Sequence, residues 1–190
     1  VTSCGGGDST SPPVPARLVF SVQPSAATAG AAFAPAHQVT VQDGSGNVVS
    51  SSTLSITVAL ATGSGTAGAH LRGTATVSAV NGVAVFNGLS IDSAGTGYTL
   101  TATSSGLASA TSSPFSVSVG TEARLVFVVQ PSVAYAGWPI VPGVQVAVLD
   151  SVGNRVTNSV ATITFAITTG TGTAGAVLGG TSTAAAASGL

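Results

Sequence analysis

The sequence predicts an all-β protein built from tandem antiparallel β-sandwiches, and three observations support this prediction. Short runs of alternating apolar and polar residues recur along the chain, which is the pattern of half-buried strands. Clusters of Gly, Pro, Asn and Ser separate these runs, as turns between strands require. The chain also repeats itself, because Ala16-Arg17-Leu18-Val19-Phe20 returns 107 residues later as Ala123-Arg124-Leu125-Val126-Phe127. A repeat of this length suits a string of small domains rather than a solenoid.

The repeat divides the chain into four parts. A flexible leader covers residues 1–15, a first domain residues 16–119, a short linker residues 120–122, and a second domain residues 123–190. Further along the chain, Gln23-Pro24-Ser25 matches residues 130–132. The match between the two copies continues as far as Gly82, which corresponds to Gly189. The second copy therefore contains no counterparts of residues 84–119.

The second domain is accordingly predicted to be a sandwich that lacks its C-terminal strands. We expect its core side chains Leu125, Phe127 and Phe165 to be uncovered and one strand edge to be unpaired. Two sources of the missing strands stay open. Either the chain continues beyond Leu190, or a neighbouring subunit donates strands.

The first domain contains about seven predicted strands, which is typical of an antiparallel sandwich. The first covers residues 17–22, where Leu18, Phe20 and Val22 alternate with side chains of the opposite face. Similar runs cover residues 38–42, 54–60, 74–79, 83–91, 98–103 and 115–119. No segment shows an amphipathic helical stripe, and the alanine-rich run 184–187 aligns with the strand around Val77, so we predict a strand there.

The alternation also predicts the residues of each core, while Thr40 is expected on the opposite, exposed face. Tyr98 stands where its hydroxyl can reach back to the turn that contains Asp92 and Gly95, as in a tyrosine corner. The predicted core of the first domain is Leu18, Phe20, Ile56, Val58, Leu60, Phe86, Leu89, Ile91, Leu100, Phe115 and Val117. That of the second domain is Leu125, Phe127, Val146, Val148, Ile163, Phe165, Ile167 and Leu178.

Three stretches resemble bacterial immunoglobulin-like domains of the invasin and intimin type. They are Val39-Thr40-Val41-Gln42-Asp43 with Gly46-Asn47-Val48-Val49, then Gly82-Val83-Ala84-Val85-Phe86, then Gly97-Tyr98-Thr99-Leu100-Thr101-Ala102. The resemblance covers nearly all of residues 16–190 and implies an immunoglobulin-like sandwich for each repeat. It says little about function, because such sandwiches have unrelated roles.

Charge is scarce throughout the chain. Nine side chains carry formal charge, none of them lysine, and the net charge is −1. An ordinary soluble domain has about 25% charged residues. The composition argues against nucleic-acid binding and against a polybasic membrane patch, both of which need clustered Arg and Lys. An uncharged surface of this kind suits burial against other proteins.

The one cysteine, Cys4, lies in a sequence that resembles a bacterial lipoprotein processing box. Small residues precede it, and Gly5-Gly6-Gly7-Asp8 begins a spacer rich in Gly, Ser and Pro that extends to Pro15. Cys4 is therefore a candidate lipid-attachment site that would place the protein on a membrane surface. The alternative is an unmodified or intermolecularly paired thiol.

Several motifs that could carry chemistry have simpler structural interpretations. The run from Gly63 to Gly68 matches the dinucleotide-binding pattern, but a strand rather than a helix is predicted after it, so we interpret it as a glycine-rich connection. Asp43 with Asn47, repeated as Asp150 with Asn154, offers too few carboxylates for calcium and favours a hairpin turn. We therefore expect no cofactor.

Neither a metal site nor a catalytic site is predicted. His37 and His70 are expected at exposed or edge positions, and neither has a cysteine or paired acid at ligand spacing. The five acidic residues are scattered, and no serine lies in a nucleophile-elbow pattern. The sequence indicates a protein that is not an enzyme.

The loop around Trp138 is the clearest difference between the repeats. Tyr135, Trp138 and Ile140 occupy positions where the first domain has Thr28, Ala31 and Phe33. Trp and Tyr on loops are frequent in interface hot spots, so these three are candidate partner contacts. The alternative is that Trp138 packs within its own domain or against its neighbour.

These observations favour a membrane-extrinsic structural or scaffold subunit that docks on and stabilises a larger assembly of the bacterial cell envelope, at its periplasmic or extracellular face. A general resemblance, tied to no single motif, points to immunoglobulin-like extrinsic subunits of photosynthetic reaction-centre–antenna complexes. The alternative function is a spacer in a surface adhesin or fibre. A carbohydrate-binding module would need a row of aromatic side chains, and the chain has two Tyr and one Trp.

Overall fold

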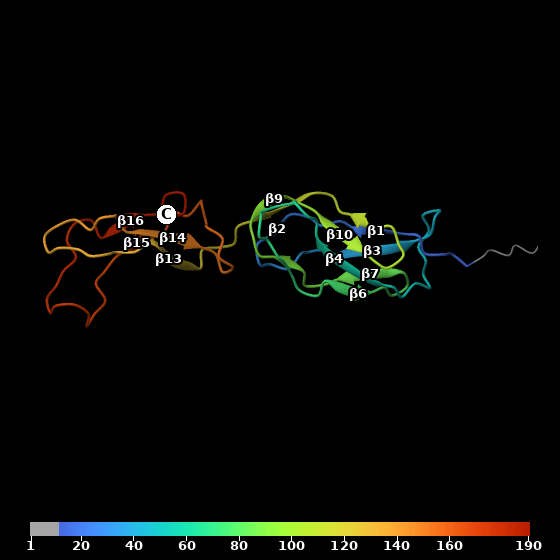
Figure 1. Ribbon diagram of the computed structural model, residues 1–190, viewed down its shortest axis with the longest axis horizontal. Helices are drawn as coiled ribbons and strands as arrows, with labels where there is room; N and C mark the ends of the chain where they lie inside the picture. Colours follow the sequence, from blue (N-terminus) through green and yellow to red (C-terminus); the bar gives the residue numbers. More distant parts are fainter. Residues whose placement is uncertain (1–11) are drawn as a thin grey trace, which may run out of the picture.

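The computed structural model describes residues 12–190, and its ordered elements are all β-strands (Figure 1). The predicted all-β class is confirmed. The strands of the first repeat (residues 16–119) are β1 (Arg17–Val22), β2 (Ala27–Thr28), β3 (His37–Gln42), β4 (Ser55–Leu60), β5 (Leu71–Arg72), β6 (Thr76–Ser78), β7 (Val83–Phe86), β8 (Ser90–Ile91), β9 (Gly95–Tyr98), β10 (Leu100–Thr103), β11 (Ala110–Thr111) and β12 (Phe115–Ser118). Those of the second repeat (residues 123–190) are β13 (Arg124–Val129), β14 (Gln145–Leu149), β15 (Thr162–Thr164) and β16 (Thr183–Ala185).

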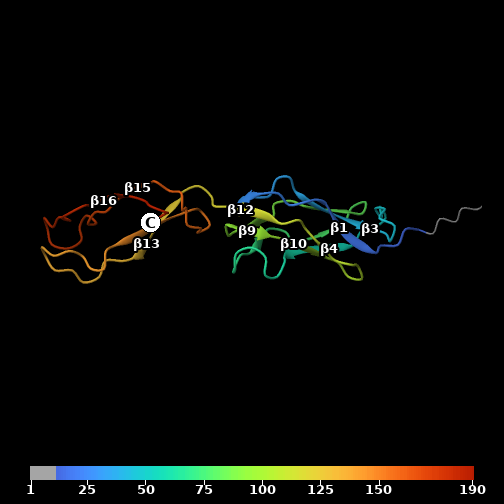
Figure 2. The same cartoon turned by 90° about the horizontal axis from the view of Figure 1, so that it is seen from above.

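Two layers of strands enclose the core of the first repeat (Figure 2). One layer is the antiparallel sheet β1-β3-β7. The other contains β11-β10-β4-β6 and β2-β12-β9, where β9 and β10 follow each other with Thr99 between them. A small β5-β8 pair lies beside them. The predicted strand 83–91 is divided into β7 and β8 because Asn87 and Gly88 make a turn, with Gly88 at a φ of +72°.

The predicted core of the first repeat is confirmed at every position except Leu60, which is partly buried. The alternation of apolar residues therefore identified the inward faces correctly. Tyr98 is fully buried, and its hydroxyl donates a hydrogen bond of 2.8 Å to the carbonyl oxygen of Ser93, as the tyrosine-corner prediction requires. The ring stacks on Phe115 at a centroid separation of 5.9 Å.

Two predictions about the central strand β3 are wrong. Thr40 is not exposed but has 6% of its surface accessible, and its hydroxyl donates to the carbonyl of Val19 on the neighbouring strand. His37 is completely buried against the ring of Phe33, at a centroid distance of 4.4 Å. Neither of its ring nitrogens has a hydrogen-bond partner. Because β1 and β7 flank β3 on both sides, neither residue occupies a sheet edge.

The second repeat reproduces the strand pairing of the first. β13 pairs with β14 in the register of β1 with β3, including the irregularity after Phe127 that matches the one after Phe20. β15 pairs with β16 in the register of β4 with β6, so the alanine-rich run contributes to a strand as predicted. The internal repeat is thus a structural repeat over the residues that both copies contain.

The core of the second repeat is small, and the prediction for it holds in part. Val146, Val148 and Ile163 are buried, whereas Leu125 and Phe127 are 55% and 50% exposed, as expected for an incomplete sandwich. Phe165, which was also expected to be uncovered, is instead partly buried against the core. Two predicted core residues are exposed instead, namely Ile167 and Leu178.

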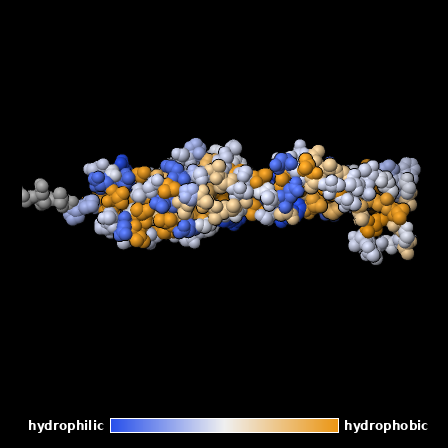
Figure 3. All heavy atoms as spheres, turned by 180° about the vertical axis from the view of Figure 1, so that it is seen from behind, coloured by the Kyte–Doolittle hydropathy of each residue, from blue (hydrophilic) through white to orange (hydrophobic). Residues whose placement is uncertain are grey.

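The two repeats lie end to end along the long axis of the molecule (Figure 1). The turn at residues 150–154 of the second repeat contacts the loop at residues 92–94 of the first through hydrogen bonds. In the space-filling view, strongly hydrophilic residues are scattered rather than gathered in one patch, as the low charge content predicts (Figure 3).

Truncation of the same phenylalanine in each repeat should have unequal effects. Phe20→Ala removes a side chain that is 5% exposed and should lower the free energy of unfolding by about 3–5 kcal/mol. Phe127→Ala removes its half-exposed counterpart and should cost well under half of that. Urea denaturation of both variants measures the difference, and equal losses would contradict the assigned burial.

Burial of His37 should make the first repeat less stable in mild acid. Desolvation lowers the pKa of His37 from 6.5 to about 4, so the unfolded chain binds a proton at a higher pH than the folded one. The free energy of unfolding should be unaffected by His37 above about pH 6.5. It should fall by up to about 3 kcal/mol as the pH decreases towards 4.

The matched variant is His37→Val, since the second repeat has Val144 at this position. Denaturation midpoints between pH 7 and pH 4 should be flatter for this variant than for the natural chain. Parallel pH profiles for both proteins would show that His37 is not the responsible group.

Candidate interaction surfaces

The candidate lipid-attachment residue, Cys4, lies outside the described residues. The described chain begins at Pro12, and residues 12–14 are exposed. Residues 12–15 lie at the end of the first repeat that is remote from the second repeat (Figure 1).

The aromatic loop lies at the opposite end of the molecule. It belongs to the connection between β13 and β14, which leaves the sheet on the side away from the 150–154 turn. Tyr135 and Trp138 are each 75% exposed. The backbone N–H of Trp138 donates to the carbonyl of Tyr135 at 3.0 Å, the same turn that Ala31 and Thr28 form in the first repeat.

The structure separates the three candidate partner contacts into two kinds. Trp138 does not pack within its own repeat, so the internal-packing alternative is not supported. Ile140 occupies the position of Phe33, which is 6% exposed in the core of the first repeat. Ile140 is half-buried, so it offers less surface to a partner than Tyr135 and Trp138 do.

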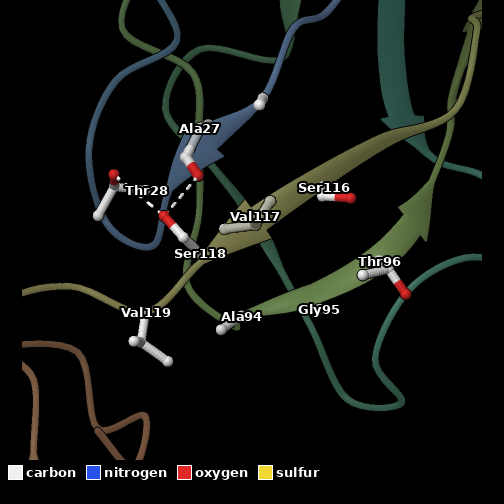
Figure 4. A pocket seen from close by; sticks show the side chains of 10 residues that line it. Ala27, Thr28, Ala94, Gly95, Thr96, Ser116, Val117, Ser118 and Val119 are labelled. Carbon is white, nitrogen blue, oxygen red and sulfur yellow. Dashed lines mark hydrogen bonds between the residues drawn. The ribbon is translucent and has the colours of Figure 1, made fainter. Parts of the chain in front are cut away.

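A shallow groove of about 570 Å³ lies along β2, β9 and β12 of the first repeat (Figure 4). Small side chains line it, among them Ala27, Thr28, Thr96 and Ser118. The Ser118 hydroxyl lies within hydrogen-bonding distance of the Thr28 hydroxyl and of the Ala27 carbonyl, at 3.4 and 3.2 Å. No acid, base or thiol lines the groove, so its residues offer no group that could activate a substrate.

The glycine-rich run from Gly63 to Gly68 connects strands, as predicted. The ring of Tyr98 lies where a Cβ on Gly65 would be, and Gly65 has a φ of +67°. Strand β5, not a helix, follows. Without a helix N-terminus the run cannot hold a pyrophosphate in the way the dinucleotide motif does.

The prediction of hairpin turns at residues 43–47 and 150–154 is also confirmed. Asp43 Oδ1 accepts the backbone N–H groups of Ser45 and Asn47, each at 2.9 Å. These hydrogen bonds, the one from Asn47 first, lower the pKa of Asp43. Asp150 forms the corresponding bonds within its own turn. Among the described residues, no three His, Cys, Asp or Glu side chains are grouped in a way that could hold a metal ion.

Asp92 forms an ion pair with Arg72 that the sequence did not predict. Arg72 donates to Asp92 Oδ2 from two nitrogens, at 2.8 and 3.1 Å, and the backbone N–H of His70 donates to Oδ1 at 2.8 Å. Burial raises the pKa of Asp92, but these bonds outweigh it and the net shift is downward. His70 is exposed, as predicted. The charges lie 20 residues apart, and no local pattern indicates their pairing.

Comparisons with known proteins identify no family for this chain. No family model matches it, and no curated protein matches it. Solved structures with a partial likeness include two of the β-glucuronidase of Parabacteroides merdae, one with glycerol in its active site, at 22% and 23% identity and TM-scores of 0.35 and 0.34. Each match covers 52% of this chain and 12% of the glucuronidase. A likeness this weak carries no argument about activity.

Within the described part of the chain, no helix has the length and apolar character that crossing a bilayer requires.

The exposure of Trp138 can be tested by fluorescence, because it is the only tryptophan. Acrylamide should quench its emission in the native protein nearly as efficiently as in the urea-unfolded chain. The measurement should be repeated over a range of protein concentrations. Strong protection from quenching in the dilute monomer would show that Trp138 is buried and would remove it from the candidate contacts.

Proposed function

We propose that the chain is a non-enzymatic, membrane-extrinsic structural subunit of a bacterial cell envelope, in which two immunoglobulin-like repeats join an anchored end to a docking end. The observation that carries this proposal is the position of its two candidate contact regions. Residues 12–15, which follow the segment with Cys4 in the sequence, lie at one end of the elongated molecule, and the Tyr135–Trp138 turn lies at the other (Figure 1).

The immunoglobulin-like assignment is supported by the strand order of the first repeat. The sheet β1-β3-β7 faces a layer in which β12 lies between β2 and β9 and in which β10 pairs with β4. The hydrogen bond from Tyr98 to the Ser93 carbonyl is the corner expected of such domains. The shared register of the two repeats extends the assignment to the second.

Docking through the second repeat is supported by its exposed aromatic side chains. Trp and Tyr supply large contact area at a small cost in conformational entropy, and few charges need to be desolvated on this surface. The partner would be another protein of the envelope. The general resemblance of the sequence favours a photosynthetic reaction-centre–antenna complex as the assembly.

The second candidate function is that of a spacer in a surface adhesin or fibre. The direct hydrogen bonds between the repeats favour it, because they hold the two repeats end to end. A spacer does not need the aromatic residues of the 135–138 turn. The two functions therefore differ in what those residues do.

A fractionation experiment separates these functions. Tyr135→Thr with Trp138→Ala gives the second repeat the residues of the first repeat at these positions and should not disturb its core. This double variant should stay on membranes but no longer co-purify with its partner assembly. Cys4→Ser should instead release the chain from membranes.

The control is Thr28→Ala with Ala31→Ser, which changes the same turn of the first repeat and should leave both properties intact. Unchanged co-purification of the Tyr135 and Trp138 double variant would favour the spacer. Membrane retention of Cys4→Ser, together with an unmodified N-terminus by mass spectrometry, would contradict lipid anchoring.

A further inference from the structure

The two repeats contain the same turn in two different settings. In both, the aspartate at the first position accepts backbone N–H groups of the turn, and the asparagine at the fifth position donates its side-chain N–H to that aspartate. The Asn47 to Asp43 bond measures 3.2 Å, and the Asn154 to Asp150 bond 2.9 Å. These bonds form the turn itself and do not depend on what surrounds it.

Among the described residues, the turn of the second repeat contacts the other repeat and the turn of the first does not. The side chain of Asn154 accepts the backbone N–H of Ala94 at 3.0 Å and donates to the carbonyl of Asp92 at 2.9 Å. A single amide thus makes a donor and an acceptor bond to the loop at residues 92–94, about 60 residues earlier in the chain. Such a two-point contact fixes direction as well as distance.

The loop that receives Asn154 is itself held in place by the first repeat. The carbonyl of Ala94 accepts the hydroxyl of Thr66 at 2.7 Å, and the carbonyl of Ser93 accepts the hydroxyl of Tyr98. The Asp92 side chain is bonded to Arg72 and to the backbone of His70. Movement of the loop would therefore break bonds within the first repeat.

Gly30 and Val152 lie in contact beside these hydrogen bonds. A Cβ placed on Gly30 would lie 2.7 Å from Cγ1 of Val152, so a side chain at this position would require Val152 to move. In the linker, Gly120 donates its N–H to Asp150 Oδ2 at 3.0 Å. Asp150 is completely buried.

We propose that the 150–154 turn is a docking element that fixes the orientation of the second repeat on the first, and that Asn154 is the residue that couples them. Its binding surface is the 92–94 loop together with Gly30, and the partner this surface fits is the Asp-x-x-x-Asn turn of a following repeat. This inference does not depend on the partner or the location proposed above.

The 43–47 turn of the first repeat has the same internal bonds but contacts none of the described residues of the second repeat. Its Asn47 is exposed, Ser45 replaces the apolar Val152, and Pro13 replaces Gly120. Proline has no N–H, so it cannot make the linker bond to the aspartate. The 43–47 turn therefore has the internal bonds and the asparagine of the docking element, but not the counterparts of Val152 and Gly120.

The experiment compares Asn154→Ala with Asn47→Ala in the full chain. Each variant loses the same bond within its turn, and only the first also loses the two bonds to the other repeat. Residual dipolar couplings should give one common alignment tensor for both repeats in the natural chain and in Asn47→Ala, and two different tensors in Asn154→Ala. Exchange of the Ala94 amide hydrogen should become about tenfold faster or more in Asn154→Ala only, because it loses its acceptor.

The proposal is overturned if Asn154→Ala keeps the common tensor and a protected Ala94 amide. It is equally overturned if the repeats of the natural chain already align independently, a measurement that needs no variant and so decides the matter even if Asn154→Ala does not fold. A similar loss of alignment in Asn47→Ala would show that turn stability, not docking, is responsible.

Discussion

The hydroxyl of Tyr98 connects the hydrophobic core of the first repeat to the place where the second repeat sits. Its ring is fully buried and stacks on Phe115, and its hydroxyl holds the carbonyl of Ser93 at 2.8 Å. Ser93 is the middle residue of the 92–94 loop, whose backbone groups on either side bond to Asn154. The position of the second repeat therefore depends on the packing of the first, and core and contact surface form one continuous structure.

The scarcity of charge determines what kind of contact the repeats can make. Exposed ion pairs contribute little and weaken as salt increases. The contact instead uses an amide side chain and backbone groups, with one carboxylate, that of Asp150, buried beneath it. Burial raises the pKa of Asp150, but hydrogen bonds from the side chain of Asn154 and the backbone of Gly120 outweigh this and lower it, so hydrogen bonds keep the carboxylate ionised. A contact of this kind should vary little with ionic strength.

Local pattern was enough to predict the strands and most of the core of the first repeat, because alternation reports which side chains share a face. His37 lies on the inward face of β3 with Val39 and Val41, but the predicted strand began at residue 38 and left it out. Thr40 lies on the opposite face, where alternation predicts exposure, so its burial has no local signal. The Asp92 ion pair and the Asn154 contact also escaped prediction. Both join residues far apart in sequence, and the sequence signal at position 154 is identical to that at position 47, where no such contact exists.

Comparison of the two copies shows how a repeat can change its neighbours without changing its fold. The residues that build the turn, Asp and Asn with the glycine at 46 or 153 between them, are the same in both repeats. The residues that differ are Val152 for Ser45, within the turn, and Gly120 for Pro13, before the domain. The stability of a repeat array is close to the sum of the stabilities of its repeats and the interaction energies between neighbouring repeats. These few positions can therefore change the interaction between neighbours without changing the stability of either repeat. The shared Asp and Asn of the turn therefore do not by themselves reveal which of its copies contacts another repeat.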